Sequence, residues 1–113
     1  MRTMTMRPAA VAGSFYPGNA RTLGAEVGGM LAHATVQKVQ GAAPKALIVP
    51  HAGYVYSGPV AASAYVTLRK SAMAIRRVII FGPAHRVWVP GLAAPSAGLF
   101  ETPLGRIAVD RAA

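Results

Sequence analysis

Apolar and polar positions follow a helical period near the start of the chain. Between residues 20 and 34, apolar side chains recur at positions 23, 27, 30, 31 and 34, which is the spacing of one helical face. Asn19 directly precedes this stretch, and asparagine is a common N-cap because its side chain accepts a hydrogen bond from a free backbone N–H. The pattern therefore predicts a helix over residues 20–34, capped by Asn19. His33 falls in its last turn, where we expect a surface histidine rather than a ligand.

Two short apolar runs predict strands that are buried on both faces. Residues 46–49 (ALIV) form the first run and residues 77–81 (RVIIF) the second, and proline or glycine-proline follows each. Such runs, ended by turn residues, are typical of the strands of a parallel sheet. A third strand is predicted over residues 106–110, after a turn at 102–105.

The segment between the two apolar runs predicts a helix from Pro59 to Leu68. Proline is favoured in the first turn of a helix, because its missing N–H is not needed there, and Ser57 or Gly58 would be the N-cap. The order strand, helix, strand across residues 46–81 is the signature of a βαβ unit, whose right-handed crossover makes the two strands parallel. We therefore expect an α/β fold with a βαβ-based sheet flanked by helices.

Two histidines follow the two predicted strands. His51 lies two residues beyond Val49, and His85 lies four residues beyond Phe81. The carboxyl ends of parallel strands meet at one edge of an open sheet, where such sheets bind their ligands. Neutral imidazole is a common metal ligand, so the pair predicts a shared metal site; the alternative is two isolated loop histidines. Two histidines do not complete a site, because catalytic zinc and non-haem iron centres use three protein ligands.

Hydroxyl groups and one indole lie close to these histidines in the sequence. Tyr54, Tyr56 and Ser57 follow His51 in a glycine-containing stretch and are predicted to line the pocket, where tyrosine hydroxyls could orient a substrate. Ser57 could equally cap the following helix. Trp88, just after the second histidine, is predicted to wall the pocket, with core filling as the alternative. No residue is assigned as a catalytic group.

Composition and charge narrow the classes of protein that the chain can be. Of its 113 residues, 53% are hydrophobic and only 13% are charged, which excludes a disordered acidic or basic tail. The sequence holds no cysteine, so it offers no disulfide and no thiolate ligand, and we expect a reducing, cytoplasmic location. The net charge of +9 invites a nucleic-acid partner, but the basic residues are spread along the chain without a basic stripe. Prolines and glycines interrupt the uncharged stretch 46–68, so we expect no membrane helix.

Four blocks of sequence together resemble the Memo family, the B component of the AmmeMemoRadiSam set. The blocks follow the family's order: residues 12–17 (AGSFYP), 50–58 (PHAGYVYSG) with 64–65 (AY), 81–85 (FGPAH), and 101–105 (ETPLG) with 109–110 (VD). The resemblance implies a fold similar to the class III extradiol dioxygenases, which have an α/β sheet flanked by helices. It also implies that His51 and His85, which match the family's two N-terminal histidines, bind a redox metal such as iron or copper.

The chain departs from the family's pattern at two places. Family members usually have serine before the second histidine and often histidine after it, whereas this chain has Ala84 and Arg86. Family members also continue past the position of Asp110, and their remaining pocket residues lie in that continuation. The resemblance therefore implies that residues 1–113 are the N-terminal portion of a single, truncated Memo-like α/β domain, which we expect to be inactive alone.

Two classes of function stay open at this point. The first is a Memo-like, metal-dependent oxidoreductase that acts on oxygen or a small aromatic at a metal bound by His51 and His85. The second is a non-catalytic binding or scaffold protein that offers the same pocket to a small molecule, a peptide or a partner. A nucleic-acid binder is the least supported class. The low charge and the missing continuation also predict an exposed apolar surface through which the chain associates.

Overall fold

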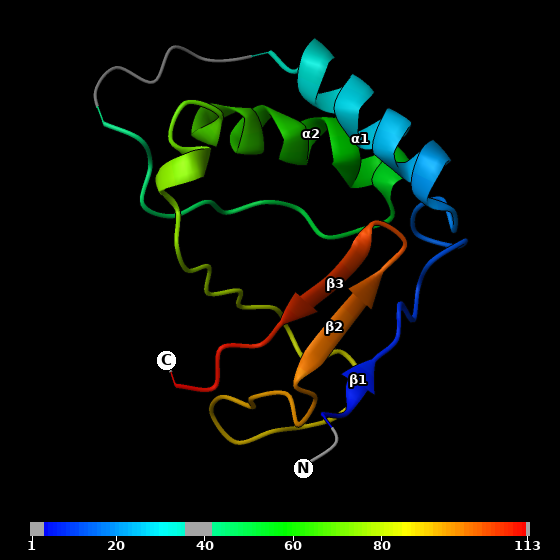
Figure 1. The fold of residues 1–113 in the computed structure, drawn as a ribbon, viewed down its shortest axis with the longest axis vertical. Helices are drawn as coiled ribbons and strands as arrows, with labels where there is room; N and C mark the ends of the chain where they lie inside the picture. The colour runs from blue at the N-terminus through cyan, green and yellow to red at the C-terminus, as the bar shows by residue number, and fades with distance from the viewer. Residues whose placement is uncertain (1–3, 36–41, 113) are drawn as a thin grey trace.

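Two helices lie at one end of the molecule and a small three-stranded sheet at the other (Figure 1). The computed structural model describes residues 4–35 and 42–112. The α-helices are α1 (Ala20–His33) and α2 (Tyr54–Tyr65), and the 3₁₀ helices are η1 (Val66–Leu68) and η2 (Ala72–Ala74). The strands are β1 (Met6–Arg7), β2 (Leu99–Thr102) and β3 (Gly105–Ala108). The predicted α/β class is thus confirmed.

Helix α1 matches the helix that the apolar pattern predicts. The Asn19 side chain caps it by accepting a hydrogen bond from the backbone N–H of Thr22 at 2.9 Å. Leu23, on the apolar face, is buried. His33 is exposed in the last turn, and its Nδ1 lies 2.8 Å from the carbonyl oxygen of Gly29. Local spacing and capping were sufficient to predict this helix.

Helix α2 begins at Tyr54 rather than at the predicted Pro59, which lies inside the helix. The backbone N–H of Tyr54 donates to the carbonyl oxygen of Phe15 at 2.8 Å, and Gly53 is the N-cap. This contact with the N-terminal loop starts the helix one turn earlier than the local signals indicate. Pro59 costs the helix one backbone hydrogen bond, since proline has no N–H to donate.

The sheet joins the two ends of the chain. β1 pairs with β2 in parallel, with Met6 opposite Leu99, and β2 pairs with β3 as an antiparallel hairpin. The predicted third strand corresponds to β3, and the predicted turn before it is formed at residues 102–105. Gly105 has a φ of 140°, which favours glycine at the end of this turn.

The two apolar runs are extended but unpaired, so the described residues contain no βαβ unit. Residues 46–49 and 77–81 form no ladder with any strand in the part of the chain that the structure describes. Ile48 is fully exposed, and Val78, Ile79, Ile80 and Phe81 are 70–87% exposed. Strands of this composition need hydrogen-bonded neighbours and cover on both faces. The described residues supply neither.

Helices α1 and α2 pack directly against each other. Gly58 of α2 faces Met30 of α1, and a Cβ atom at this position would overlap the methionine sulfur. The absence of a side chain at Gly58 therefore permits the close approach of the two helices. Ala62, one turn further along α2, is buried. In the described residues no helix is long and apolar enough to span a membrane.

Candidate functional site

The side chains of His51 and His85 converge, although they lie 34 positions apart in sequence. His51 comes from the extended segment that leads into α2, and His85 comes from the loop that follows residues 77–81. Their Nε2 atoms are 3.2 Å apart, and the two rings are tilted by 36° with centroids 5.4 Å apart. The predicted meeting of the two histidines is thus observed, but it does not take place at the edge of a paired sheet.

The two imidazole rings approach each other through their Nε2 atoms. At 3.2 Å, one ring donates its Nε2–H to the lone pair of the other ring. Both histidines are exposed, so solvent and small solutes reach the pair. The two Nε2 atoms therefore meet at one position that solvent reaches.

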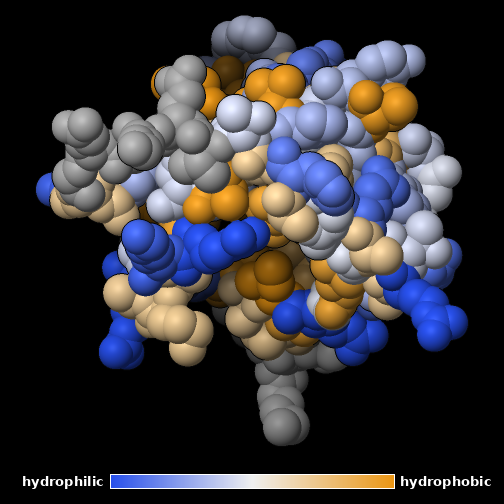
Figure 2. All heavy atoms as spheres, turned by 90° about the horizontal axis from the view of Figure 1, so that it is seen from above, coloured by the Kyte–Doolittle hydropathy of each residue, from blue (hydrophilic) through white to orange (hydrophobic). Residues whose placement is uncertain are grey.

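Both histidines line a cavity of about 1030 Å³. Its walls are formed by α1, α2 and the two extended segments, and they are mostly apolar, with contributions from Val27, Met30, Ala61, Tyr65, Ile75 and Ile80. Among the described lining residues, Arg69 is the one with a permanent charge, and its guanidinium donates to the carbonyl oxygen of Leu31 at 3.3 Å. Figure 2 shows apolar side chains, in orange, within hollows between hydrophilic ones. The cavity therefore suits an apolar or aromatic group.

Tyr54 lines this cavity and packs on a second tyrosine. The ring centroids of Tyr54 and Tyr16 are 5.4 Å apart. Burial raises the pKa of the Tyr54 hydroxyl, and the charges of Tyr16, Tyr65 and Glu26 raise it further. Tyr54 is therefore a neutral hydrogen-bond donor at physiological pH. Tyr16 was not predicted as a site residue, although it lies within the first block of the family resemblance.

Ser57 lines the same cavity, but its hydroxyl has a structural role. It is buried and donates to the carbonyl oxygens of Ala52 at 2.7 Å and Gly53 at 3.2 Å. These bonds hold the first turn of α2 to the backbone just after His51. The predicted N-cap role of Ser57 is therefore wrong, because Gly53 is the N-cap and Ser57 lies within α2. Its hydroxyl instead ties the first turn of the helix to the loop that carries the histidine.

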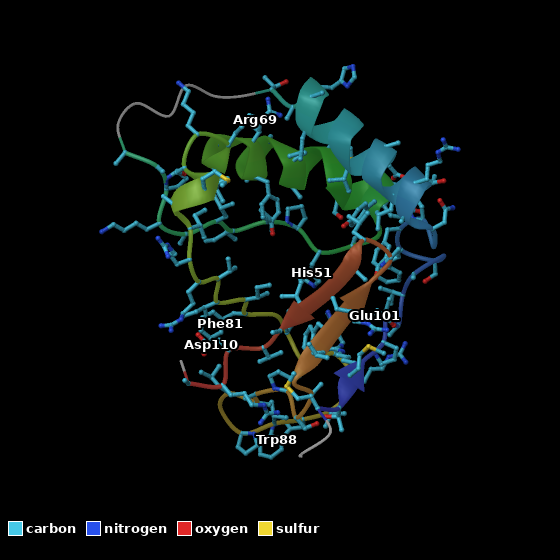
Figure 3. All side chains as sticks on the ribbon, viewed as in Figure 1. His51, Arg69, Phe81, Trp88, Glu101 and Asp110 are labelled. Carbon is cyan, nitrogen blue, oxygen red and sulfur yellow. The ribbon has the colours of Figure 1, made fainter. Side chains whose placement is uncertain are left out.

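Tyr56 and Trp88 lie outside the histidine cavity, contrary to the prediction. Tyr56 is 81% exposed, because it projects from the side of α2 opposite to the buried Ser57 and Gly58. It lines a smaller cavity of about 520 Å³ together with Tyr54. Trp88 is 84% exposed, and Figure 3 shows it beyond the sheet, far from His51. Trp88 was predicted to line the cavity because it follows His85 closely in the sequence. The loop after His85 leads away from the cavity, so this prediction is wrong.

No third ligand joins the histidine pair within residues 4–35 and 42–112, where no group of three histidine, cysteine or carboxylate side chains could hold a metal ion. Two of the three acidic residues are engaged elsewhere. Asp110 pairs with Arg77 at 2.9 Å, and Glu101 pairs with Arg106 at 3.3 Å. The site as described consists of two imidazoles and an apolar cavity.

Comparison with known proteins gives consistent matches. The family model described as Memo-like protein matches residues 7–113. A MEMO1 family protein of Ignicoccus hospitalis is 39% identical over 114 residues, which is 95% of this chain and 40% of that protein. Protein MEMO1 of Danio rerio is 40% identical over 108 residues, covering 96% of this chain. Protein MEMO1 of Mus musculus is 38% identical over 105 residues, covering 93%. The chain spans 35% and 34% of the lengths of these two vertebrate relatives.

Proposed function

Since this chain belongs to the Memo-like protein family, we propose that it binds a redox metal, iron or copper, between His51 and His85. The observation that carries the proposal is the 3.2 Å separation of the two Nε2 atoms. Two side chains from segments far apart in the sequence present the same kind of nitrogen donor to one position. The metal would be held by these two histidines and by solvent or donors from outside the described residues.

The donor set fits a transition metal. Two imidazole nitrogens that each lie about 2.1 Å from one ion can be at most about 4.2 Å apart. The observed separation falls within that span, so both rings can bind one ion with small movements. Imidazole suits iron, copper and zinc, and the affinity order of divalent ions favours copper.

The surrounding residues support an oxidoreductase role for the family's full-length members. A bound iron or copper ion would supply one-electron redox chemistry. Tyr54 would donate a hydrogen bond to a substrate oxygen, because its raised pKa keeps the hydroxyl protonated. The apolar walls of the cavity would hold a small aromatic reactant. The expected cytoplasmic location, based on the cysteine-free sequence, stays part of this proposal.

A non-catalytic binding role is the second candidate, and the apolar lining of the cavity favours it. A cavity of about 1030 Å³ is large enough for a drug-sized molecule or a short apolar peptide segment. In this role the histidines would be two polar contacts among many apolar ones. Loss of the imidazoles would then leave most of the ligand affinity intact.

Calorimetric titration of copper(II) near neutral pH tests the metal proposal. We expect one ion per chain, and we expect His51→Ala and His85→Ala each to weaken binding by about tenfold or more, since even second-shell changes cost 10–100-fold. The double variant should be little worse than either single variant, because both imidazoles serve one ion. His33→Ala is the control, as this exposed histidine lies on α1 and contacts Gly29. Parent-like copper binding by the His51 and His85 variants would contradict the proposal.

A further inference from the structure

The smaller cavity, which Tyr56 lines, has a wall of aromatic rings. We call it the aromatic cavity, and its aromatic lining residues are Phe15, Tyr16, Tyr54 and Tyr56. Two of them come from the N-terminal loop and two from the first turn of α2. Its volume of about 520 Å³ lies in the range of small-molecule sites, about 300–1,000 Å³. Neither histidine of the candidate metal site lines it.

The four rings differ in how firmly packing holds them. Tyr16 and Tyr54 are half-buried, and their ring planes are tilted by 43° to each other, so their faces point in different directions. Phe15 is 47% exposed and Tyr56 is 81% exposed. The half-buried pair is therefore a fixed corner of the cavity, and the two exposed rings border solvent. The faces of aromatic rings carry a partial negative charge.

Glu26 of α1 is the one charged residue among the described lining residues of the aromatic cavity. Its carboxylate contributes to the raised pKa of Tyr54, so its negative charge acts at that hydroxyl. Glu101 and Asp110 each pair with an arginine, whereas Glu26 forms no salt bridge within residues 4–35 and 42–112. In a protein with a net charge of +9, this cavity therefore combines ring faces with a carboxylate and offers a place for a cation.

Backbone hydrogen bonds hold the aromatic cavity in shape without a ligand. The N–H of Gly13 donates to the carbonyl oxygen of Tyr16 at 2.8 Å, and the N–H of Phe15 donates to that of Val11 at 2.9 Å. The N–H of Tyr54 donates to the carbonyl oxygen of Phe15, which joins the loop to α2. Figure 1 shows the N-terminal loop, in blue, next to the beginnings of α1 and α2. A site that is already ordered loses less free energy on binding.

We propose that the aromatic cavity binds the quaternary ammonium group of a small organic cation. A cation over an aromatic ring face is attracted by the ring quadrupole, and groups of aromatic side chains recognise quaternary ammonium ligands in this way. A fully alkylated nitrogen has no N–H group, so it leaves no donor unpaired against the rings. An anion fits poorly, because no lysine or arginine lines the cavity among the described residues. The inference does not depend on the proposed metal.

Titration with choline chloride tests this proposal. Backbone amide NMR shifts of residues 13–17 and 53–56 report binding, and a metal chelator is present throughout. The comparison ligand is the uncharged alcohol in which a carbon atom replaces the choline nitrogen. We expect saturable binding of one choline per chain and about tenfold weaker binding of the alcohol, because the two differ in charge and hardly in shape. Sodium chloride at equal concentration controls for ionic strength, and the chelator keeps the result independent of the histidine site.

Matched variants identify the residues that bind choline. Tyr56→Leu keeps an apolar side chain but removes a ring face, so it should weaken choline binding about two- to fivefold, whereas Tyr56→Phe should bind like the parent. Glu26→Gln should weaken binding by a similar factor of about two to five. Glu101→Gln is its control, because that carboxylate pairs with Arg106 in the sheet. Tyr56 and Glu26 are exposed, so their replacement leaves the packing of the helices intact.

Three results would overturn the proposal. The first is equal affinity for choline and the uncharged alcohol, since the cavity would then select apolar groups and not cations. The second is the absence of any choline-dependent shift beyond that caused by sodium chloride. The third is choline binding that Glu26→Gln weakens and Tyr56→Leu does not, since a surface ion pair would then explain the binding without the rings.

Discussion

Burial changes the chemistry of single side chains around the cavity, and Tyr54 is the clearest example. Its ring packs on Tyr16, and desolvation raises the pKa of its hydroxyl, with like charges of Tyr16, Tyr65 and Glu26 acting in the same direction. A raised pKa means that the folded state holds the proton more tightly than the unfolded chain does, whose tyrosines titrate at about 10. The stability gained from this is fully present below the unfolded pKa and is lost as pH rises through the folded pKa.

Replacement of Tyr54 tests this linkage. Raising the pH from neutral to above about 10 should lower the stability of the parent, because the Tyr54 hydroxyl must then ionise in a buried place. We expect Tyr54→Phe to lose less stability over the same pH change, since it has no hydroxyl to ionise. Denaturant midpoints measured at neutral and alkaline pH give the comparison. Tyr56→Phe, on the exposed side of α2, controls for the loss of a tyrosine hydroxyl. If both variants lessen the alkaline loss equally, the effect does not come from the burial of Tyr54.

Residue-scale reasoning from the sequence identified part of the site. The convergence of His51 and His85 was predicted from their positions after two apolar runs, and the structure places their nitrogens 3.2 Å apart. The same reasoning placed Trp88 in the pocket, where it is not found. Sequence distance is informative when a rigid element follows the residue, as α2 does after His51. It is uninformative for Trp88, which lies in an irregular loop.

At the scale of elements, the sequence predicted correctly those helix bounds that depend only on neighbouring residues. Helix α1 needs only its own apolar face and the Asn19 cap, so its bounds were predicted to within one residue. Helix α2 begins at Tyr54 because of a contact with Phe15, almost forty positions away, which no local pattern reveals. The pairing of β1 with β2 is similarly distant, between Met6 and Leu99. Such long-range contacts were beyond prediction from the pattern alone.

Two glycines on the facing helices differ in what an added methyl group would meet. Gly28 on α1 has open space at its Cβ position, whereas a Cβ at Gly58 on α2 would overlap the sulfur of Met30. We expect Gly28→Ala to stabilise the chain by about 0.5–1 kcal/mol, because alanine loses less backbone entropy in a helix. Gly58→Ala should gain less or lose stability, since Met30 must move. Thermal unfolding of both variants decides this, and an equal gain would show that the helices do not pack closely at Gly58.

At the scale of the whole molecule, a high net charge and a large apolar surface act in opposite directions. The net charge of +9 keeps copies apart, while Ile48 and residues 78–81 expose apolar side chains on segments that join no strand among the described residues. The composition predicted this exposure, because only 13% of the residues are charged. It did not reveal that the apolar runs would remain unpaired, since strand pairing depends on neighbours rather than on the run itself.

Salt should therefore control the association of the chain. At about 0.01 M ionic strength the Debye length is about 30 Å, comparable to the molecule, and repulsion between copies is effective; at about 1 M it falls to about 3 Å. We expect a monomer at low salt and growing, open-ended association at high salt, because edge-to-edge pairing that does not close generates filaments rather than defined oligomers. Light scattering across a salt series measures this. Ile80→Lys should suppress the association more than Leu92→Lys does, because the first replaces an apolar side chain within 78–81 and the second lies outside the two apolar runs. Scattering that falls as salt rises would show that charge, and not the exposed apolar segments 46–49 and 78–81, holds the copies together.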